Sequence, residues 1–490
     1  MNKIGSITVL LALVAFSLQA QPVIYSVSNA HSHNDYEQKV PFWLAYNEGF
    51  GSIEADIFLR QDSLVVAHST KELALQRTLE AWYLDPLLAC VRKNGGRPYS
   101  NGGGPLQVLI DLKTDSIHTL DRLIKVLGKY PELTGNPGIR FVITGSRPAS
   151  SLWPSYPSWI WFDGVLSDEY DKAAMDRVAM LSDDFKVFSN WNGGGNIPAP
   201  DWARLEAAVR KAHQWKKTVR FWDAPDVINA WYQFMHLQVD YINTDHIVAL
   251  SQFLHRLPKT SYTGDAAYRP YQPTYKTDGI DKPVKNVILF IGDGMGLAQL
   301  YAGCTANRGA LNIFGMRNIG LSKTDDRALS AGQWGSALPE LPAILDEKKI
   351  GTVVITFGDT LRKTLDTLSR KKQGFFIMTE TAQIDYGGHD NDLPCVATGV
   401  MDFDRTVGEA LRFADRDGET LVIVTADHET GGLTLLDDNS AKGYIGGQFS
   451  TNDQTVLPVP VFAYGPRSGL FRGVYENAAV FSKILQAYGL

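Results

Sequence analysis

The stretch SIEADIFL at residues 52–59 is a β-branched apolar run that carries two carboxylates. Similar runs occur on both sides of it: VIYSVSNAH (23–31), LQVLIDLKT (106–114), IRFVITGS (139–146), WIWFDGVL (159–166), FKVFSN (185–190), TVRFWDA (218–224) and VDYINTDH (239–246). Helix-like segments such as HTLDRLIKVLGKY and DWARLEAAVRKAHQW separate several of these runs. Eight strand–helix units in about 230 residues have the size of one (β/α)8 barrel. The sequence therefore predicts an α/β fold that begins with a TIM-type barrel over residues 22–256.

The second half of the chain has apolar strands that run directly into acidic residues or histidines. These strands lie in KNVILFIGDGMG (285–296), GFFIMTETAQID (374–385), ETLVIVTADHETGG (419–432) and PVPVFAYGP (458–466). Such a pattern is typical of an open α/β sheet whose ligands bind beyond the carboxyl ends of the strands. We predict this sheet domain over residues 284–490. A linker over 257–283 would precede it, because that segment is rich in Pro, Tyr, Gly and Asp and lacks an apolar period.

The composition excludes several classes of protein. The 490-residue chain has 47 Lys and Arg against 53 Asp and Glu, a formal net charge of −6, and 44% hydrophobic residues. This balance indicates a globular protein and excludes an intrinsically disordered one. Without a basic stripe to neutralise phosphates, nucleic acid is not expected as the main partner. The three cysteines are widely spaced, which favours structural thiols.

The N-terminal residues 1–20 have the features of a secretory signal peptide. Lys3 precedes an apolar run from Ile7 to Leu18 that is too short to span a bilayer, and Ala20 suits cleavage. No other run approaches the length of a transmembrane helix. We therefore expect an exported protein, periplasmic or secreted, with no transmembrane segment; the sequence leaves its oligomeric state open.

Polar residues gather at the ends of the early strands in the first half. Glu54, Asp56 and Asp111 are three hard oxygen donors, the ligand type that Mg²⁺ or Ca²⁺ prefers. Histidines also lie at strand ends, and two of them beside a metal-bound phosphate would serve as general base and general acid. Because the carboxyl ends of barrel strands converge on one mouth, these groups are expected to form one site.

The motifs AHSHND (30–35), SIEADIFL, VVAH (65–68) and LIDLKT (109–114) resemble the glycerophosphodiester phosphodiesterase and sphingomyelinase D group of phospholipase-C-like barrels. The resemblance implies acid–base catalysis by two histidines, metal binding by the three carboxylates, and attack on a phosphodiester by a neighbouring substrate hydroxyl. It points to His31 and His68, but His33 leaves open which histidine of the first motif is the base. Lys113 would contact the phosphate, and Arg220 and Trp222 are candidate phosphate or headgroup contacts.

The second half contains only two of the ten histidines, and both lie in the strand-end motifs. GDGMG, ETAQIDYGGHDND, VTADHETGG and PVPVFAYGP, in this order, resemble alkaline phosphatase. The resemblance implies that Asp385 and His389 bind one zinc ion. It also implies that a second zinc ion is bound by three further residues, namely Asp293, Asp427 and His428. Glu380 would help to bind a magnesium ion, and Asp293 would be a ligand of both this ion and the second zinc ion.

Three departures indicate that this second domain is truncated. The segment that carries the nucleophilic serine in alkaline phosphatases is missing after Thr324, which leaves Ser322 or Ser330 as weak substitutes. A long stretch that contains the phosphate-binding arginine is missing after residues 351–356. Gln454 stands where a third zinc ligand, a histidine, is expected, and a neutral amide is a poor zinc ligand.

The leading hypothesis is an exported, metal-dependent phosphoric ester hydrolase. Its barrel would cleave small phosphodiesters of the glycerophosphodiester or lysophospholipid type, with Mg²⁺ or Ca²⁺. Its second domain would bind Zn²⁺ and Mg²⁺ but would be impaired as a phosphatase. Two alternatives are an active alkaline-phosphatase-type phosphomonoesterase that uses the surviving ligands, and a non-catalytic phosphoester-binding protein.

Overall fold

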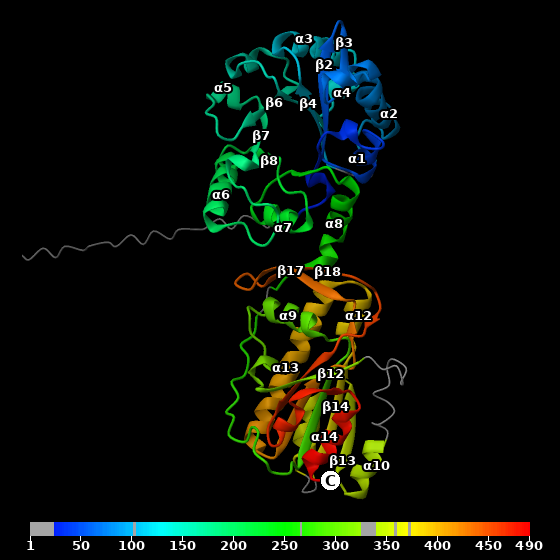
Figure 1. Cartoon of the computed structure of the whole chain (residues 1–490), viewed down its shortest axis with the longest axis vertical. Coiled ribbons are helices and arrows are strands. Elements are labelled where there is room, and N and C mark those ends of the chain that lie inside the picture. Colours follow the sequence, from blue (N-terminus) through cyan, green and yellow to red (C-terminus); the bar gives the residue numbers. More distant parts are fainter. Residues whose placement is uncertain (1–23, 101–103, 265–266, 325–339, 357–359, 371–373) are drawn as a thin grey trace, which may run out of the picture. The chain divides into compact units, whose positions relative to one another are not determined.

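The computed structural model describes residues 24–100, 104–264, 267–324, 340–356, 360–370 and 374–490. The predicted signal peptide and Ser330 lie outside these residues. The chain divides into two compact units between Leu254 and His255 (Figure 1). Within the described residues, no helix combines the length and the apolar character that crossing a membrane requires.

The first unit is a barrel of eight parallel strands, which confirms the predicted TIM-type fold. The strands are β1 (Ala30–Ser32), β2 (Ser52–Arg60), β4 (Leu106–Leu112), β5 (Ile139–Gly145), β6 (Ile160–Val165), β7 (Val178–Asp184), β8 (Thr218–Trp222) and β9 (Ile242–Thr244). They lie in the order β8-β7-β6-β5-β4-β2-β1-β9, and β3 (Ser63–Val66) pairs with β2 outside this path. A bridge between Arg220 and Tyr241 brings the two end strands together. The backbone N–H groups of Asp240 and Tyr241 both donate to the carbonyl of Val219.

Helices surround this ring of strands (Figure 1). They are α1 (Trp43–Glu48), α2 (Asp85–Lys93), α3 (Ser116–Leu127), α4 (Pro131–Thr134), α5 (Lys172–Met175), α6 (Ala199–Gln214), α7 (Ile228–His236) and α8 (Ile247–Thr260).

One predicted strand was wrong: residues 185–190 are not a strand, and β7 precedes them at Val178–Asp184. Six of the seven residues of β7 are buried, whereas Phe185–Val187 is a 3-10 turn whose N-terminus the Asp184 side chain caps.

The second unit contains a seven-stranded sheet with helices on both faces. Its strands are β13 (Gly351–Thr356), β14 (Phe375–Thr381), β11 (Asn286–Gly292), β15 (Thr420–Thr425), β20 (Val459–Tyr464), β12 (Asn318–Lys323) and β21 (Gly473–Glu476), in this spatial order. The first four are parallel, and β20 runs antiparallel to β15 and β12. This α/β sheet confirms the predicted fold class of the second half.

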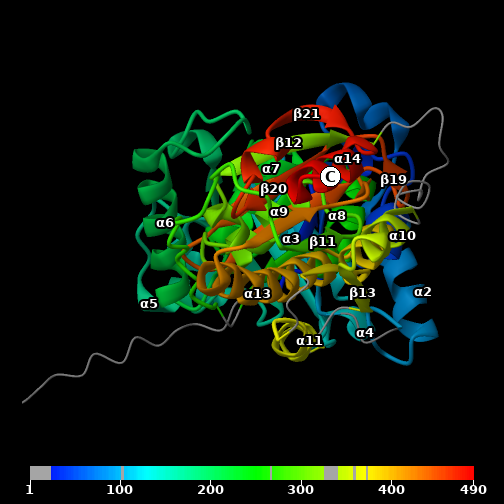
Figure 2. The same ribbon diagram turned by 90° about the horizontal axis from the view of Figure 1, so that it is seen from below.

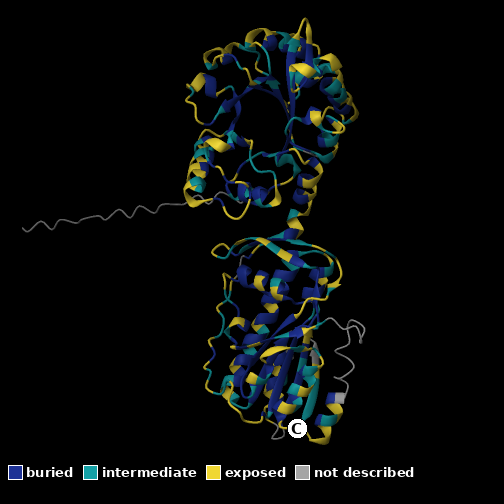
Figure 3. Ribbon diagram, in the orientation of Figure 1, coloured by how far each residue is buried: buried dark blue, intermediate teal, exposed yellow. Residues whose placement is uncertain are grey.

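Side chains of the central strand β11 alternate between two apolar clusters. Ile288 and Phe290 pack in the cluster that holds α9 (Leu297–Ala306), α11 (Thr360–Leu368), α12 (Gln383–His389) and α13 (Leu393–Asp417). Val287, Leu289 and Ile291 pack in the cluster that holds α10 (Glu340–Glu347) and α14 (Ala479–Tyr488). Figure 2 shows the long helix α13 beside the strands, and Figure 3 shows these strands buried. Burial on both faces explains why the parallel strands are continuous apolar runs.

Smaller sheets complete the second unit. A three-stranded sheet contains β10 (Ser261–Thr263), β18 (Tyr444–Phe449) and β17 (Leu433–Asn439), and β16 (Glu429–Thr430) pairs with β19 (Gln454–Thr455).

The segment 257–283 is not a free linker, and this corrects the sequence interpretation. Its first residues finish α8, and β10 pairs with β18. Tyr268 then donates its hydroxyl hydrogen to Asp404, and Tyr271 donates to Asp415 at 2.7 Å, both carboxylates lying on α13. The tyrosines that make this segment look irregular therefore attach it to the second unit.

Candidate active site and metal centres

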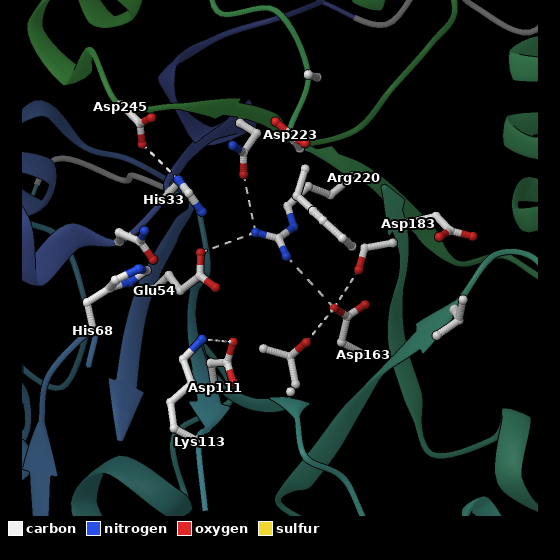
Figure 4. A pocket seen from close by; sticks show the side chains of 18 of the residues that line it. His33, Glu54, His68, Asp111, Lys113, Asp163, Asp183, Arg220, Asp223 and Asp245 are labelled. Atoms are coloured by element: carbon white, nitrogen blue, oxygen red, sulfur yellow. Dashed lines mark hydrogen bonds and ion pairs between the residues drawn. The ribbon is translucent and has the colours of Figure 1, made fainter. Parts of the chain in front are cut away.

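A cavity of about 530 Å³ opens at the carboxyl ends of the barrel strands (Figure 4). Its lining is polar and includes His33, Asn34, Glu54, His68, Asp111, Lys113, Thr144, Asp163, Ser182, Asp183, Arg220, Trp222 and Asp245. The loops that follow the strands of a (β/α)8 barrel meet at this end. The strand-end residues in this list therefore line one cavity, as expected for the mouth of a barrel.

Three carboxylates from two neighbouring strands converge in this region. Glu54 and Asp56 alternate on β2 and so share one face, and Asp56 lies opposite Asp111 of β4 in the strand register. One oxygen from each of the three lies within 4.8 Å of the others. Burial, and then the charges of the other two carboxylates, raise the pKa of Asp56 to about 6.

Two of these carboxylates fit a metal ion because each has an unused oxygen. The Oδ1 atoms of Asp56 and Asp111 are buried and have no hydrogen-bond partner among the described residues. Buried carboxylate oxygens are normally paired or bound to a metal. With Glu54 they form an all-oxygen donor set, which suits Mg²⁺ or Ca²⁺.

Lys113 lies beside the same carboxylates and lines the cavity. Its Nζ is 2.9 Å from Asp56 Oδ2 and 2.8 Å from Asp111 Oδ2. Burial lowers the pKa of Lys113, but these two carboxylates outweigh burial and raise it to about 12. A permanent positive charge at the cavity wall is compatible with the predicted phosphate contact.

Gly145 makes room for the metal-binding arrangement. It ends β5 with a φ of +70°, and a Cβ atom at this position would lie 1.8 Å from Asp111 Oδ1. Only glycine combines this left-handed backbone with space for the carboxylate.

The two histidines of the first motif have different surroundings. His31 is fully buried and is not among the residues that line the cavity. His31 Nε2 lies 2.7 Å from Arg220 Nη1, which can only donate, and 3.0 Å from Glu54 Oε2, which can only accept, while Nδ1 lies 2.8 Å from Ser52 Oγ. Burial, followed by the charge of Arg220, lowers the pKa of His31 to about 4. His31 therefore contacts the predicted metal ligand Glu54 without lining the cavity, and its catalytic role stays a prediction.

His33 lines the cavity and has a carboxylate partner. Its Nδ1 lies 2.8 Å from Asp245 Oδ1, and because a carboxylate only accepts, Nε2 is left free to accept a proton. Burial lowers the pKa of His33, but the hydrogen bond to Asp245 and the charges of Glu54 and Asp245 raise it overall. Of the two histidines, His33 thus has the geometry of a general base.

His68 lies on the cavity wall, and Tyr36 connects it to the carboxylate cluster. The Tyr36 hydroxyl donates to Asp56 Oδ2 at 2.7 Å and lies 3.0 Å from His68 Nδ1. The phenol oxygen can therefore accept from His68 Nδ1, which leaves Nε2 for a ligand. This connection orients the imidazole that the sequence predicted as the second acid–base group.

Arg220 lies on the cavity wall but is already engaged by protein groups. Its Nη1 contacts Glu54 Oε2 at 3.3 Å and Asn243 Oδ1 at 3.2 Å, and its Nη2 lies 4.0 Å from Asp163 Oδ2. The guanidinium charge contributes to lowering the pKa of Glu54 despite burial. Arg220 therefore orients Glu54, one of the three predicted metal ligands, independently of any contact that Arg220 makes to phosphate. Trp222 lines the cavity with a partly exposed ring.

The second unit brings its predicted ligands to one edge of its sheet. Asp293 follows β11, Glu380 lies on β14, and His428 follows β15, which are three neighbouring strands. Asp293, Asp385 and His428 form one group with ligand atoms within 4.8 Å, and Asp293, Glu380 and Asp427 form another. The first group offers nitrogen and oxygen, as zinc prefers, whereas the second is purely carboxylate and suits Mg²⁺.

Close contacts in this second cluster indicate that it needs a counter-charge. His428 Nε2 lies 3.1 Å from Asp427 Oδ2 and 3.5 Å from Asp293 Oδ1. His389 Nε2 lies 3.3 Å from Asp385 Oδ2. Burial, together with neighbouring carboxylates, raises the pKa of Asp293 well above its usual range. The grouping differs from the predicted zinc sites in two respects, because Asp385 lies with Asp293 and His428, and Asp427 lies with Asp293 and Glu380.

The departures from the phosphatase pattern are also visible among the described residues. Ser322 lies within β12 and is fully buried, so its hydroxyl has no access to a ligand. Gln454 is exposed on β19 opposite Thr430. The region around Ser330, where a nucleophile was considered, lies outside the described residues.

The sequence interpretation missed several residues of the barrel cavity. Tyr36, Asp163 and Asp245 contact predicted site residues or line the cavity. Asp163 lies within the apolar run 159–166 and Asp245 near the end of the run 239–246, so attention to polar residues in these runs would have selected both, whereas Tyr36 lies in the 3-10 turn Asp35–Glu37 and has no such signal.

The comparisons with known families divide the chain into two parts. Residues 20–132 match the "AIM6-like phosphodiesterase domain", residues 218–247 match the "Glycerophosphoryl diester phosphodiesterase family", and residues 353–445 match "Alkaline phosphatase". Both resemblances derived from the motifs are therefore confirmed.

Individual relatives show the same division. The chain is 28% identical over 227 residues to "Altered inheritance of mitochondria protein 6 homolog" of Arthroderma benhamiae, covering 40% of this chain and 72% of the relative. It is 46% identical over 77 residues to "Alkaline phosphatase 4" of Bacillus subtilis, covering 16% and 17%. It is 36% identical over 158 residues to "Streptomycin-6-phosphate phosphatase" of Streptomyces griseus, covering 27% and 35%. The chain thus spans well under half of these two phosphatases, and the families it resembles hydrolyse phosphoric esters.

Proposed function

We propose that the chain is an exported, metal-dependent phosphoric ester hydrolase whose barrel cleaves phosphodiesters. The observation that carries the proposal is the pair of unpartnered buried oxygens of Asp56 and Asp111 beside two cavity histidines. A carboxylate cluster next to acid–base groups is what phosphodiester cleavage requires. The signal-like N-terminus supports export.

In this proposal, Glu54, Asp56 and Asp111 hold a divalent cation, Mg²⁺ or Ca²⁺. When bound, the cation neutralises charge on the phosphate oxygens and orients the diester. His33 Nε2 takes the proton of the attacking oxygen, which belongs to a neighbouring substrate hydroxyl or to water. As the new P–O bond forms, the P–O bond to the departing alcohol breaks, and His68 donates a proton to that alcohol. The products are an alcohol and a cyclic phosphate or phosphomonoester.

The residues around the two histidines have positioning roles in this reaction. Asp245 holds His33 so that Nε2 can accept the proton, and Tyr36 holds His68. Lys113 provides a positive charge beside the metal ligands and is available to the phosphate. The expected substrates are small glycerophosphodiesters or phospholipid-derived diesters.

For the second unit we propose metal binding with impaired hydrolysis. The ligands Asp293, Glu380, Asp385, His389, Asp427 and His428 gather at the sheet edge and would hold Zn²⁺ and Mg²⁺. Ser322, the one serine of the described residues 267–324, is buried, and the serine segment of alkaline phosphatases is missing from the sequence, so we assign this unit no covalent mechanism. The alternative is a phosphomonoesterase that uses a metal-activated water, and the one observation in its favour is the surviving cluster of metal ligands.

Hydrolysis of bis(4-nitrophenyl) phosphate by wild-type protein and by His33→Asn and His31→Asn variants tests the proposal. With Mn²⁺ or Mg²⁺ supplied, His33→Asn is expected to lower kcat by about 10²–10⁴-fold, the usual contribution of a general base. Equal activity of His33→Asn and wild type would contradict the assignment. Retention of activity by His31→Asn, with less stable folding, would agree with its buried position.

A further inference from the structure

A buried carboxylate on the loop that carries His33 takes no part in the reaction proposed above. Asp35 is fully buried and is not among the residues that line the cavity. Its Oδ1 accepts from Ser32 Oγ at 2.8 Å. Its Oδ2 accepts from the Tyr83 hydroxyl at 3.0 Å and from the backbone N–H of Phe42 at 2.5 Å. Because a carboxylate is costly to bury, these hydrogen bonds point to a role for the group.

The three donors to this carboxylate come from separate elements. Ser32 ends β1, Phe42 precedes α1, and Tyr83 lies in the helical turn that follows the loop of His68. Asp35 therefore ties the loop after β1 to the segment that follows β3. These are the two parts of the chain that supply the acid–base histidines.

The backbone of the loop after β1 has left-handed torsion angles on both sides of the carboxylate. Phe42 has φ +63° and ψ −56°, and Asn34 has φ +44° and ψ +45°. A bulky residue such as phenylalanine adopts a positive φ only where its surroundings impose it. Asp35 accepts the Phe42 N–H, and the Phe42 ring stacks on Tyr46 with 5.1 Å between the ring centroids. The hydrogen bond and the ring packing together hold this unfavourable conformation.

The loop held in this way positions Tyr36. This tyrosine lies in the 3-10 turn that begins at Asp35, and its hydroxyl is 3.0 Å from His68 Nδ1. The His68 side chain is 52% exposed, and its next carboxylate neighbour, Asp56 Oδ2, is 3.8 Å away. The contact with Tyr36 is therefore the closest interaction that orients the His68 imidazole among the described residues.

His33 depends less on Asp35 because it has anchors of its own. Its backbone N–H donates to the carbonyl of Thr244 at 3.1 Å, and its Nδ1 lies 2.8 Å from Asp245 Oδ1 (Figure 4). Thr244 ends β9, and Asp245 follows it directly. Loss of the hydrogen bonds to Asp35 should therefore displace the Tyr36 hydroxyl more than the His33 imidazole.

We propose that Asp35 is a positioning residue for the acid of the reaction: it fixes the turn that carries Tyr36, and Tyr36 orients His68 for proton donation to the departing alcohol. This inference rests on the proposed phosphodiesterase function and adds to it a residue outside the cavity. Proton donation matters most for an alcohol that is a poor leaving group, because its P–O bond does not break readily without the proton. A 4-nitrophenolate ion departs without one.

Two diesters of glycerol phosphate that differ only in the leaving group test this role, the ethyl diester and the 4-nitrophenyl diester. In Asp35→Asn an amide N–H₂ replaces one acceptor and opposes the donors around it. With Mn²⁺ supplied, this variant is expected to lower kcat for the ethyl diester by about 100-fold and for the 4-nitrophenyl diester by less than about threefold. Phosphorus NMR follows the first substrate, and absorbance follows the second.

A double-mutant cycle tests whether Asp35 acts through the tyrosine. Tyr36→Phe should show the same selective loss on the ethyl diester. The double variant Asp35→Asn/Tyr36→Phe should lie within about threefold of Tyr36→Phe alone, because both changes act on the same imidazole.

Asp404→Asn is the matched control. Asp404 of the second unit is also fully buried and also accepts from a tyrosine hydroxyl and from backbone N–H groups. This variant should leave both diester rates unchanged. If Asp35→Asn fails to fold, Tyr83→Phe removes one donor to Asp35 and should still lower the ethyl rate relative to the 4-nitrophenyl rate, by a smaller factor.

Two results would overturn the proposal. An equal loss on both diesters would show that Asp35 only stabilises the barrel, and independent, additive losses in the double variant would show that it does not act through Tyr36. If wild-type protein with Mn²⁺ cleaves neither diester, the phosphodiesterase function fails, and the role of Asp35 fails with it.

Discussion

Replacing Gly145 by alanine perturbs the barrel site mainly at the Asp111 carboxylate. The Cβ of alanine would lie 1.8 Å from Asp111 Oδ1, whereas Cβ contacts shorter than 3.0 Å essentially never occur. The carboxylate must therefore move by about 3.0 − 1.8 = 1.2 Å, and metal–ligand distances tolerate only about 0.2 Å. The backbone φ of +70° adds about 1–2 kcal/mol of strain to the folded state.

We expect Gly145→Ala to bind Mn²⁺ at least about 100-fold more weakly than wild type, because even outer contacts of a metal site contribute 10–100-fold. Diesterase activity should fall in parallel, while the free energy of unfolding falls by only about 1–2 kcal/mol. Titration calorimetry with Mn²⁺, diester kinetics and urea unfolding measure these three quantities.

Gly195→Ala separates strain from displacement of the ligand. Gly195 has a similar φ of +59°, but nothing lies within 4 Å of its added Cβ. This variant should lose comparable stability and keep its Mn²⁺ affinity. Wild-type Mn²⁺ affinity in folded Gly145→Ala would refute the assignment of Asp111 Oδ1 as a metal ligand.

Three further predictions concern protonation and the second unit. Asp245→Asn removes the hydrogen bond that raises the pKa of His33. The rise of diesterase activity with pH, which follows deprotonation of this base, should therefore shift to lower pH in the variant. An unshifted pH–rate profile would contradict this prediction. The pKa of His31 is lowered to about 4 in the folded protein, so the unfolded chain binds a proton that the folded chain excludes. The free energy of unfolding should therefore fall as the pH drops from 6.5 to 4. Urea unfolding should show a smaller fall in His31→Gln, and an identical fall would contradict the interpretation. His428→Asn should weaken Zn²⁺ binding in calorimetry and leave diester hydrolysis unchanged; loss of diesterase activity would contradict two independent sites.

The sequence predicted the main architecture because the fold depends on strongly repeated patterns. Apolar runs that end in polar residues identified most barrel strands and the central strands of the second sheet. The prediction failed for β7, because VAMLSDD alternates weakly and the more apolar FKVFSN beside it was chosen instead. It also failed for the segment 257–283, where tyrosine side chains pack on the second unit without any local period.

The candidate site was only partly predictable for a different reason. Motif positions identified Glu54, Asp56 and Asp111, but the environment of a histidine depends on residues far away in sequence. His31 contacts Arg220, and His33 is oriented by Asp245, partners separated by 189 and 212 positions. No local pattern reports such contacts, so the sequence alone could not distinguish the surroundings of the two histidines.

Phosphorus NMR of the purified protein tests the central claim most directly. The samples contain glycerophosphodiesters and lysophospholipids with Mg²⁺, Ca²⁺ and Zn²⁺, and Glu54→Gln is compared with wild type. We predict that a diester signal disappears, that a monoester or cyclic phosphate signal replaces it, and that Glu54→Gln abolishes this change. Free phosphate formed equally by both proteins would place the activity in the second unit. Unchanged spectra with every substrate would contradict an enzymatic barrel.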